Sequence, residues 1–241
     1  MYLGIDRTGG GWLTAENDGD AYSFEKYPSI FSVWKNHVLD ADRDLEQILV
    51  DVPIGLRDDG EPRECDTAAR KRARSSTVFP TPTHAAVFES AYVDAKQTNL
   101  EETDGEKSLN TQTWSITPGI REVHELFDKY PDAQDLMRES HPEVCLWALN
   151  DHQTVESKKK TDEGFDERVE ILAPHGEHVR DSIDDAIERF AMSGVKPDDF
   201  VDALALAITA AGDLASLPDD SSQTHDETWD VPCEIVYRAD G

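Results

Sequence analysis

The chain has 241 residues, 38% of them hydrophobic, and it carries 51 acidic against 23 basic side chains, for a formal net charge of −28. This length fits one large domain with a proper core, and the charged residues alternate with Trp, Leu and Val, which excludes wholesale disorder. No apolar run approaches the length of a membrane span, so we expect no membrane partner.

The excess of acidic residues is typical of a halophilic protein. In a high-salt cytoplasm the Debye length falls to about 3 Å at 1 M, which screens the self-repulsion of the carboxylates. In dilute salt a net charge of −28 would disfavour nucleic acid, but in molar salt only local contacts at the binding site matter. The overall charge therefore leaves a nucleic-acid partner open.

The cysteines predict a reducing compartment. Cys65, Cys145 and Cys233 are few, odd in number and without metal-ligand spacing, as expected of reduced, packed thiols. The N-terminus enters strand-like sequence directly, without the basic and apolar regions of a secretory signal. We therefore expect a cytoplasmic location.

The N-terminal quarter of the chain predicts a meander of three strands, then a helix and a fourth strand. Residues 1–6, 9–17 and 21–27 are strand-like and are joined by short turns, which favours antiparallel pairing. Residues 28–38 have helical spacing, and residues 47–55 form a continuous apolar strand that enters a Pro–Gly loop. Because a crossover helix precedes this strand, we expect it to lie parallel to the first.

The remainder of the chain is mainly helical. We expect residues 57–132 to form a largely helical insertion over the active-site end of the sheet. A strand is expected at 135–139, helices at 142–150, 162–172, 180–194 and 197–214, and a closing edge strand at 233–238. This order predicts a single α/β domain over residues 1–241, with an RNase H-like mixed sheet (an antiparallel meander plus parallel strands) flanked by helices. The same arrangement builds each half of the actin-like kinases.

Three aspartates stand at the start of the most apolar helix, in PDDFVDALALAITAA. Asp198 and Asp199 follow Pro197 in the first turn, where carboxylates interact favourably with the helix dipole. Asp202 lies a full turn further into a helix that is apolar on nearly every side, and a buried carboxylate needs a partner or a metal. Asp199 and Asp202 leave the same side of the helix, where a cation would relieve their repulsion.

Acidic residues also end three predicted strands: Asp6, Asp51 and Glu139. The carboxyl ends of adjacent strands are where α/β sheets bind ligands, and a helix packed across the sheet would bring Asp199 and Asp202 there. Oxygen ligands without His or Cys fit Mg²⁺ or Mn²⁺, and paired ions could activate a water for phosphodiester hydrolysis. As alternatives, Asp6 could be a turn aspartate, and Glu139 could pair with Arg138. The candidate catalytic residues are Asp6, Asp51, Glu139, Asp199 and Asp202.

Basic residues cluster in two runs, AARKRARSS and SKKKT. A basic run is usually a solvated face, but in a chain with so few basic residues clustering favours recognition of phosphate. His141 and Gln112 are further polar candidates, for which a structural role is the alternative. The candidate substrate-binding residues are Arg63, Arg70, Arg72, Arg74, His141, Lys159 and Lys160.

Seven motifs occur in an order that resembles one known family. They are GIDRTGGGW (4–12), DVPIGL (51–56), RECDTAAR (63–70), VFPTP (78–82), ESHPEV (139–144), SKKKTDEG (157–164) and DDFVDA (198–203). Together they resemble the domain-of-unknown-function family 429, described as predicted RNase H-like nucleases. The resemblance covers nearly the whole chain.

The acid positions are also similar to those of RuvC-type resolvases, with one acid on the first strand, one on the fourth and two on the last helix. This similarity implies that the metal ligands are Asp6, Asp51, Asp199 and Asp202. Arg7 departs from the small residue expected after the first aspartate, which could alter access to the site.

The leading functional hypothesis is a nuclease dependent on Mg²⁺ or Mn²⁺ that acts on nucleic acid. An actin-like phosphotransferase or ATPase is the alternative, since GIDRTGGGW also resembles a phosphate-gripping hairpin. Such proteins need two domains around the nucleotide, and 241 residues barely allow them. A non-catalytic nucleic-acid-binding module is a third possibility, against which the complete set of acids argues.

The acidic composition predicts that stability depends on salt. Transfer from molar KCl to dilute buffer should lower the thermal midpoint or unfold the protein, because the repulsion that comes with a net charge of −28 is then unscreened. Thermal melts followed by circular dichroism at several KCl concentrations measure this. A midpoint that does not change with salt would contradict the halophilic interpretation.

Overall fold

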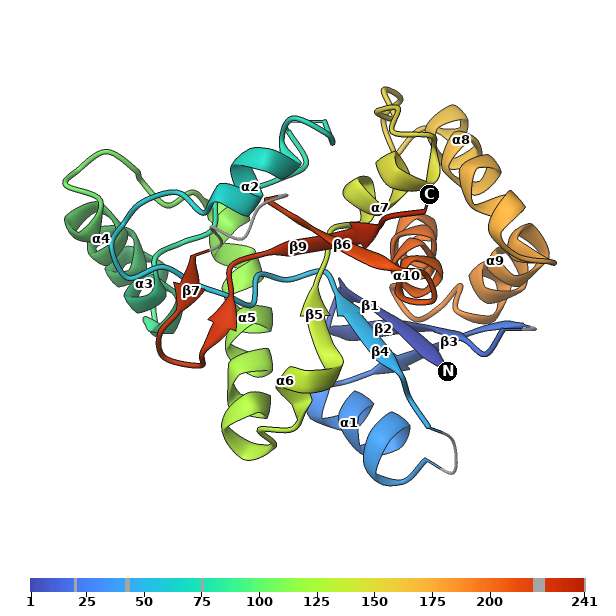
Figure 1. Cartoon of the computed structure of the whole chain (residues 1–241), viewed down its shortest axis with the longest axis horizontal. Coiled ribbons are helices and arrows are strands. Elements are labelled where there is room, and N and C mark those ends of the chain that lie inside the picture. Colours follow the sequence, from blue (N-terminus) through green and yellow to red (C-terminus); the bar gives the residue numbers. More distant parts are fainter. Residues whose placement is uncertain (20, 42–43, 75, 219–223, 241) are drawn as a thin grey trace.

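The computed structural model describes residues 1–19, 21–41, 44–74, 76–218 and 224–240. A five-stranded mixed sheet of order β3-β2-β1-β4-β5 lies at its centre (Figure 1). Its strands are β1 (Tyr2–Thr8), β2 (Gly11–Asn17), β3 (Tyr22–Tyr27), β4 (Gln47–Val50) and β5 (Met137–Glu139). The first three form an antiparallel meander, while β4 pairs in parallel with both β1 and β5. The predicted α/β class and mixed sheet are confirmed.

Helices flank the sheet and fill the connection between β4 and β5. The crossover from β3 to β4 is α1 (Ile30–Trp34), capped by Ser29 and continued by a π-helical turn (Lys35–Leu39). Between β4 and β5 lie α2 (Glu64–Ala69), α3 (His84–Phe88), α4 (Tyr92–Glu102), α5 (Thr111–Lys129) and α6 (Ala133–Leu136). After β5 come α7 (Pro142–Leu149), α8 (Asp162–Leu172), a 3₁₀ turn (Ala173–His175), α9 (Val179–Arg189) and α10 (Pro197–Ala210). The single domain and the boundaries of the insertion at 57–132 stay predictions.

The C-terminal segment builds two small sheets instead of closing the main one. Strand β9 (Ile235–Arg238) pairs antiparallel with β6 (Leu214–Leu217), and β7 (His225–Asp226) pairs with β8 (Val231–Pro232). The predicted helix at 197–214 ends at Ala210, so its last residue instead begins β6. Within the described ranges, the C-terminal segment meets the end of β5 only through an isolated bridge between Ser140 and Val236, because the chain turns into α7 directly after β5. Residues 219–223, between β6 and β7 in the chain, lie outside the described residues.

Alternation along the strands sends apolar side chains into two cores, one on each face of the sheet. Leu3 and Ile5 of β1 pack with α1 and α5, whereas Leu49 of β4 packs with α7 and α10. Because the side-chain period in a strand is two, Gly4 and Asp6 point to the face opposite Leu3 and Ile5. That face is the one covered by α10.

Helix α10 lies directly against β1 at Gly4. All residues of the helix from Asp199 to Ala210 are buried. A Cβ atom on Gly4 would collide with the carbonyl oxygen of Ala203 and the amide nitrogen of Ala207. The missing side chain therefore lets the helix approach the sheet closely, and this approach fixes its first turns relative to the strand ends.

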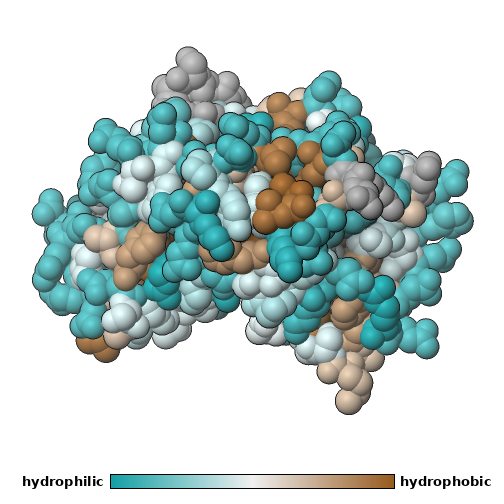
Figure 2. All heavy atoms as spheres, turned by 90° about the horizontal axis from the view of Figure 1, so that it is seen from below, coloured by the Kyte–Doolittle hydropathy of each residue, from teal (hydrophilic) through white to brown (hydrophobic). Residues whose placement is uncertain are grey.

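Hydrophilic side chains dominate the face of the molecule drawn in Figure 2, in keeping with the acidic composition. Figure 2 shows one face of the molecule, on which hydrophobic side chains form small, separate groups. Large exposed hydrophobic side chains in the described part of the chain are Leu39, Phe88, Val93 and Met192. Across the described residues, no helix combines the length and the apolar character needed to cross a membrane.

We expect Gly4→Ala to destabilise the protein by about 3 kcal/mol, because the added methyl group meets backbone atoms that cannot move aside without shifting α10. Urea denaturation in molar KCl measures this change. Gly9→Ala is the matched control in the same strand-to-turn segment, since the nearest atom to its Cβ, the carbonyl oxygen of Gly194, is 3.9 Å away. Equal losses in the two variants would contradict the close packing of α10 on β1.

Candidate functional site

The two predicted strand-end aspartates meet on the face that α10 covers. Asp6 follows Gly4 by two residues, and Asp51 follows Leu49 by two, so both side chains leave the sheet toward α10. The Asp51 amide donates to the carbonyl oxygen of Ile5 (2.9 Å), which continues the pairing of the two strands up to the site. The two carboxyl groups are close enough that each affects the pKa of the other.

The start of α10 brings two further aspartates to these strand ends. Asp199 Oδ2 accepts hydrogen bonds from Thr8 Oγ1 (2.6 Å) and from the Lys196 amide (3.0 Å), so it caps the helix and ties it to β1. Asp202, one turn later, is only 3% exposed, and its Oδ2 accepts a hydrogen bond from Lys159. Among the described residues, its buried Oδ1 has no hydrogen-bond partner. A buried carboxylate oxygen of this kind calls for a ligand.

Burial raises the pKa values of three of these carboxyl groups, those of Asp6, Asp51 and Asp202. Burial is the main cause that raises the pKa of Asp6 well above its ordinary value, followed by the charges of Asp51 and Asp202. Burial also raises the pKa of Asp51. It raises the pKa of Asp202 to about 6, although the ammonium of Lys159 acts in the opposite direction. When fully ionised, the cluster therefore carries more negative charge than its surroundings offset.

The ammonium group of Lys159 is the cation that stands in this cluster. Its Nζ lies 2.6 Å from Asp202 Oδ2 and 3.7 Å from Asp198 Oδ2. Burial lowers the pKa of Lys159, but the charges of Asp202 and Asp6 outweigh burial, so the pKa is raised. Lys159, predicted from sequence as a substrate-binding residue, is placed by the structure against the predicted metal ligands.

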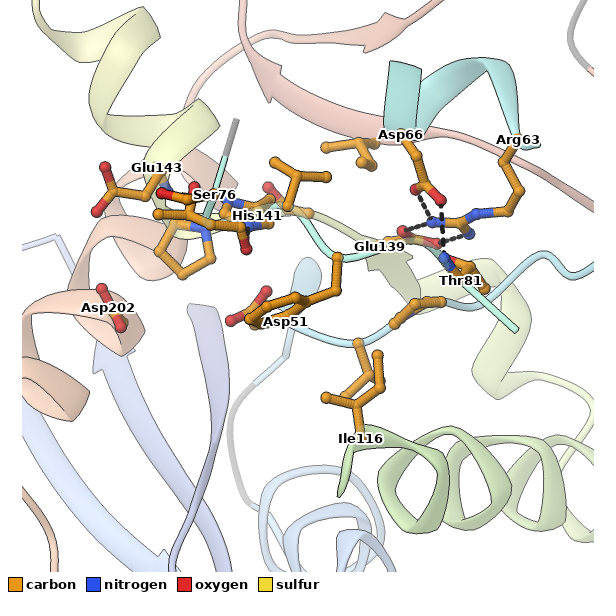
Figure 3. Close-up of a pocket in the computed structure, with 18 of the residues that line it drawn as sticks. Asp51, Arg63, Asp66, Ser76, Thr81, Ile116, Glu139, His141, Glu143 and Asp202 are labelled. Carbon is orange, nitrogen blue, oxygen red and sulfur yellow. Dashed lines mark hydrogen bonds and ion pairs between the residues drawn. The ribbon is translucent and has the colours of Figure 1, made fainter. Parts of the chain in front are cut away.

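A cavity of about 310 Å³ opens beside the acid cluster. Figure 3 shows Asp202 at one end of it, Asp51 near the middle, and Arg63 with Asp66 and Glu139 at the other end. The charged residues that line it are Asp51, Arg63, Asp66, Glu139, Glu143, Lys159 and Asp202. Five of these are acidic and two are basic, so the wall of the cavity favours a bound cation.

Glu139 does not join the acid cluster, contrary to the expectation from sequence. Glu139 on β5 pairs with Val50 on β4, and paired residues of neighbouring strands lie on the same face of the sheet. Val50 packs with α1 and α5, so Glu139 lies on the face that these helices cover. One Glu139 oxygen accepts from Arg63 (2.6 Å) and the other from the Ile54 amide (2.7 Å). Arg63 also donates to Asp66 (2.5 Å). Burial raises the pKa of Glu139 to about 7, against the effect of the guanidinium.

The predicted basic runs are dispersed. Arg70 and Arg74 donate to backbone carbonyl oxygens (3.1 and 3.2 Å), and the guanidinium of Arg72 lies over the ring of Trp147 (5.4 Å). Lys160 is exposed. Arg70 lines a second cavity, next to the first. Arg72, Arg74 and Lys160 line neither of the two cavities. Substrate binding by Arg72, Arg74 and Lys160 stays a prediction.

His141 lies at the wall of the first cavity, where it also caps α7. Its Nδ1 accepts a hydrogen bond from the Glu143 amide (3.2 Å), and its Nε2 is 3.3 Å from the carbonyl oxygen of Thr77. Gln112, the other polar candidate, is exposed on α5. His141 therefore has a structural role that is compatible with contact to a ligand.

Three charged residues of this region were not singled out from the sequence. Arg168 donates to both carboxylate oxygens of Glu143 (2.8 and 3.0 Å), and this buried pair supports the wall of the first cavity. Asp66 is the third. Its spacing from Arg63 (i, i+3 at the start of a helix) was a usable signal. Glu143 and Arg168 are far apart in the sequence, so the signal for their pairing was weaker. It consisted of an arginine within a largely acidic helix.

Comparison with known proteins places the chain in a family. Residues 4–223 match the family model described as "Protein of unknown function (DUF429)". The chain belongs to this family. The DUF429 match covers all seven motifs, so the family resemblance is confirmed, and the match itself assigns no reaction. No curated protein and no solved structure matches the chain.

The role of Lys159 as counter-ion predicts a pH-dependent loss of stability in Lys159→Met. The pKa of Asp202 is raised in the folded state, so the stability it contributes is present below its ordinary pKa and is lost as pH rises through about 6. Without the ammonium this loss deepens. Because the Lys159 side chain is 35% exposed and screened by water, we expect a loss of about 1–2 kcal/mol at pH 8 and less at pH 5.

Urea denaturation of metal-free protein at pH 5 and pH 8 measures this effect. Lys160→Met is the matched control in the same run and should change stability by less than about 0.5 kcal/mol at either pH, because Lys160 is exposed. A Lys159→Met variant whose loss is the same at both pH values would show that the ammonium does not compensate the acid cluster.

Proposed function

We propose that this DUF429 protein is a metal-dependent nuclease that hydrolyses phosphodiester bonds of nucleic acid by using Mg²⁺ or Mn²⁺. One observation carries the proposal: Asp6, Asp51, Asp199 and Asp202 converge from β1, the end of β4 and α10 beside a cavity. Gathering buried carboxylates that repel one another opposes folding, so such a cluster is more readily explained by function than by stability.

The donor set suits a hard divalent cation. All four side chains offer carboxylate oxygens, and one oxygen of Asp202 is buried without a partner in the described part of the chain. In the arrangement described, no three His, Cys, Asp or Glu side chains are close enough to form a complete metal site. The ammonium group of Lys159 instead forms an ion pair with Asp202. A divalent ion would therefore compete with this ammonium for Asp202.

The residues would divide the work according to their positions. Asp6, Asp51, Asp199 and Asp202 would hold the ion or ions. When bound, Mg²⁺ or Mn²⁺ lowers the pKa of a bound water and neutralises the leaving oxygen. Thr8 would keep Asp199 oriented through its 2.6 Å hydrogen bond. Lys159, which lines the cavity, would offset the charge of a bound phosphate.

The nucleic-acid partner and the cytoplasmic location belong to the same proposal. The whole chain repels nucleic acid in dilute salt, so substrate binding must depend on local cations, on bound metal and on salt that screens the remaining carboxylates. Cleavage should therefore be assayed in molar KCl with single- and double-stranded DNA and with RNA.

We expect Asp202→Asn to reduce metal-dependent cleavage at least about 100-fold, because the site loses a charged ligand while the side chain keeps its shape. Mn²⁺ should raise the melting temperature of the wild type and raise that of the variant much less, by mass action on the native state. Gel-based cleavage and thermal melts with and without Mn²⁺ measure the two effects, and circular dichroism checks that the variant is folded.

Asp198→Asn is the matched control on the same helix. Asp198 is 3.7 Å from Lys159 and is not one of the proposed ligands, so cleavage and the Mn²⁺ shift should stay near wild type. If no nucleic acid is cleaved with either metal, the nuclease proposal is wrong. If Asp202→Asn keeps full activity, the acid cluster is not the nuclease site.

A further inference from the structure

A second cavity, of about 420 Å³, lies next to the first and is separate from the acid cluster. The two cavities share Arg63, Asp66 and Thr81 as lining residues, so the ion pair of Arg63 with Asp66 stands between them. The second cavity extends from there to Arg70 at the end of α2 and to Thr113 in the first turn of α5. Its volume lies in the range of small-molecule sites.

Four side-chain donors among its lining residues are buried and lack a partner. Within the described residues, the atoms without a hydrogen bond include Arg63 Nε, Arg70 Nη2, Thr81 Oγ1 and Thr113 Oγ1. Arg63 is 3% exposed and Thr113 is 2% exposed, so bulk water does not satisfy them. Buried polar groups are normally hydrogen-bonded, and four such donors around one cavity indicate a missing acceptor.

The charge of this wall also differs from that of the chain as a whole. Its charged lining residues are Arg57, Glu61, Arg63, Asp66, Arg70, Glu106 and Lys107. Four are cations and three are carboxylates, in a chain where acids outnumber bases by 51 to 23. The Asp66 carboxylate already accepts from Arg63 and from the Thr81 amide. The four unpartnered atoms can all donate a hydrogen bond, and donors without an acceptor favour a bound anion.

We propose that the second cavity binds a phosphate group. Two guanidinium N–H groups and two hydroxyl groups, from four separate points of the chain, suit an acceptor with oxygens on several sides, and guanidinium groups recognise phosphate well. The phosphate comes either from a small phosphorylated molecule, for which the cavity has room, or from free phosphate. Binding here does not depend on cleavage at the acid cluster.

Calorimetric titration of the full chain tests the site, in metal-free buffer at constant KCl, with adenosine 5′-monophosphate, inorganic phosphate and adenosine as probes. We expect the monophosphate to bind and adenosine not to bind. Thr113→Val should weaken binding about tenfold, because it removes one hydrogen bond to a charged acceptor. It should leave the stability of the free protein unchanged, since the hydroxyl has no partner to lose in the described structure.

Thr117→Val is the matched control one turn along α5. The Thr117 hydroxyl donates to the carbonyl oxygen of Trp114 (3.0 Å), and Thr117 is not among the lining residues. This variant should bind like wild type and be slightly less stable. Arg70→Gln provides a second test and should weaken binding about tenfold or more at the same KCl concentration, because it removes a charged donor.

The outcomes separate this site from the nuclease site. Asp202→Asn should bind the probe like wild type, whether or not the protein cleaves nucleic acid. Inorganic phosphate binding as tightly as the monophosphate, with the same response to Thr113→Val, would identify free phosphate as the source. Absence of binding by both phosphate probes, or binding that Thr113→Val and Arg70→Gln leave unchanged, would overturn the proposal.

Discussion

The packing of α10 across β1 at Gly4 is the contact on which the arrangement of the site depends. Because Gly4 has no side chain, the backbone of α10 approaches the strand at Ala203 and Ala207. The same approach carries the first turns of the helix to the ends of β1 and β4, and the hydrogen bond from Thr8 to Asp199 fastens them there. One close contact between backbones thus sets the relative positions of side chains almost two hundred residues apart.

This close packing has an electrostatic consequence. Carboxylates that would be solvated on a looser fold are buried together, and burial is the largest cause of the raised pKa values of Asp6, Asp51 and Asp202. Lys159 supplies one positive charge from a loop before α8. The remaining imbalance makes the cluster a source of instability, and under the proposed function a bound cation would relieve it.

The buried cluster of Arg63, Asp66 and Glu139 divides the space beside the sheet into two cavities of different character. On the side of Asp51 and Asp202 the wall is acidic, and on the far side cations slightly outnumber carboxylates. Neighbouring cavities with opposite preferences are compatible with a site that holds metal in one and phosphate in the other. The cluster is rigid, because each carboxylate is held by the guanidinium and by a backbone amide.

The sequence by itself predicted the strands of the main sheet, the helices α1 and α7 to α10, and the aspartates at their ends, because these follow from local periodicity and from spacing along one element. It also predicted that Asp6, Asp51, Asp199 and Asp202 would meet. Side chains alternate between the two faces along a strand, and residues one turn apart share a face of a helix, so the direction of each side chain follows from its position. Only the tertiary structure decided that Glu139 faces the other side of the sheet, that Lys159 reaches the acids, and that β9 pairs with β6. Those outcomes depend on register and on contacts between distant segments, which no local pattern encodes.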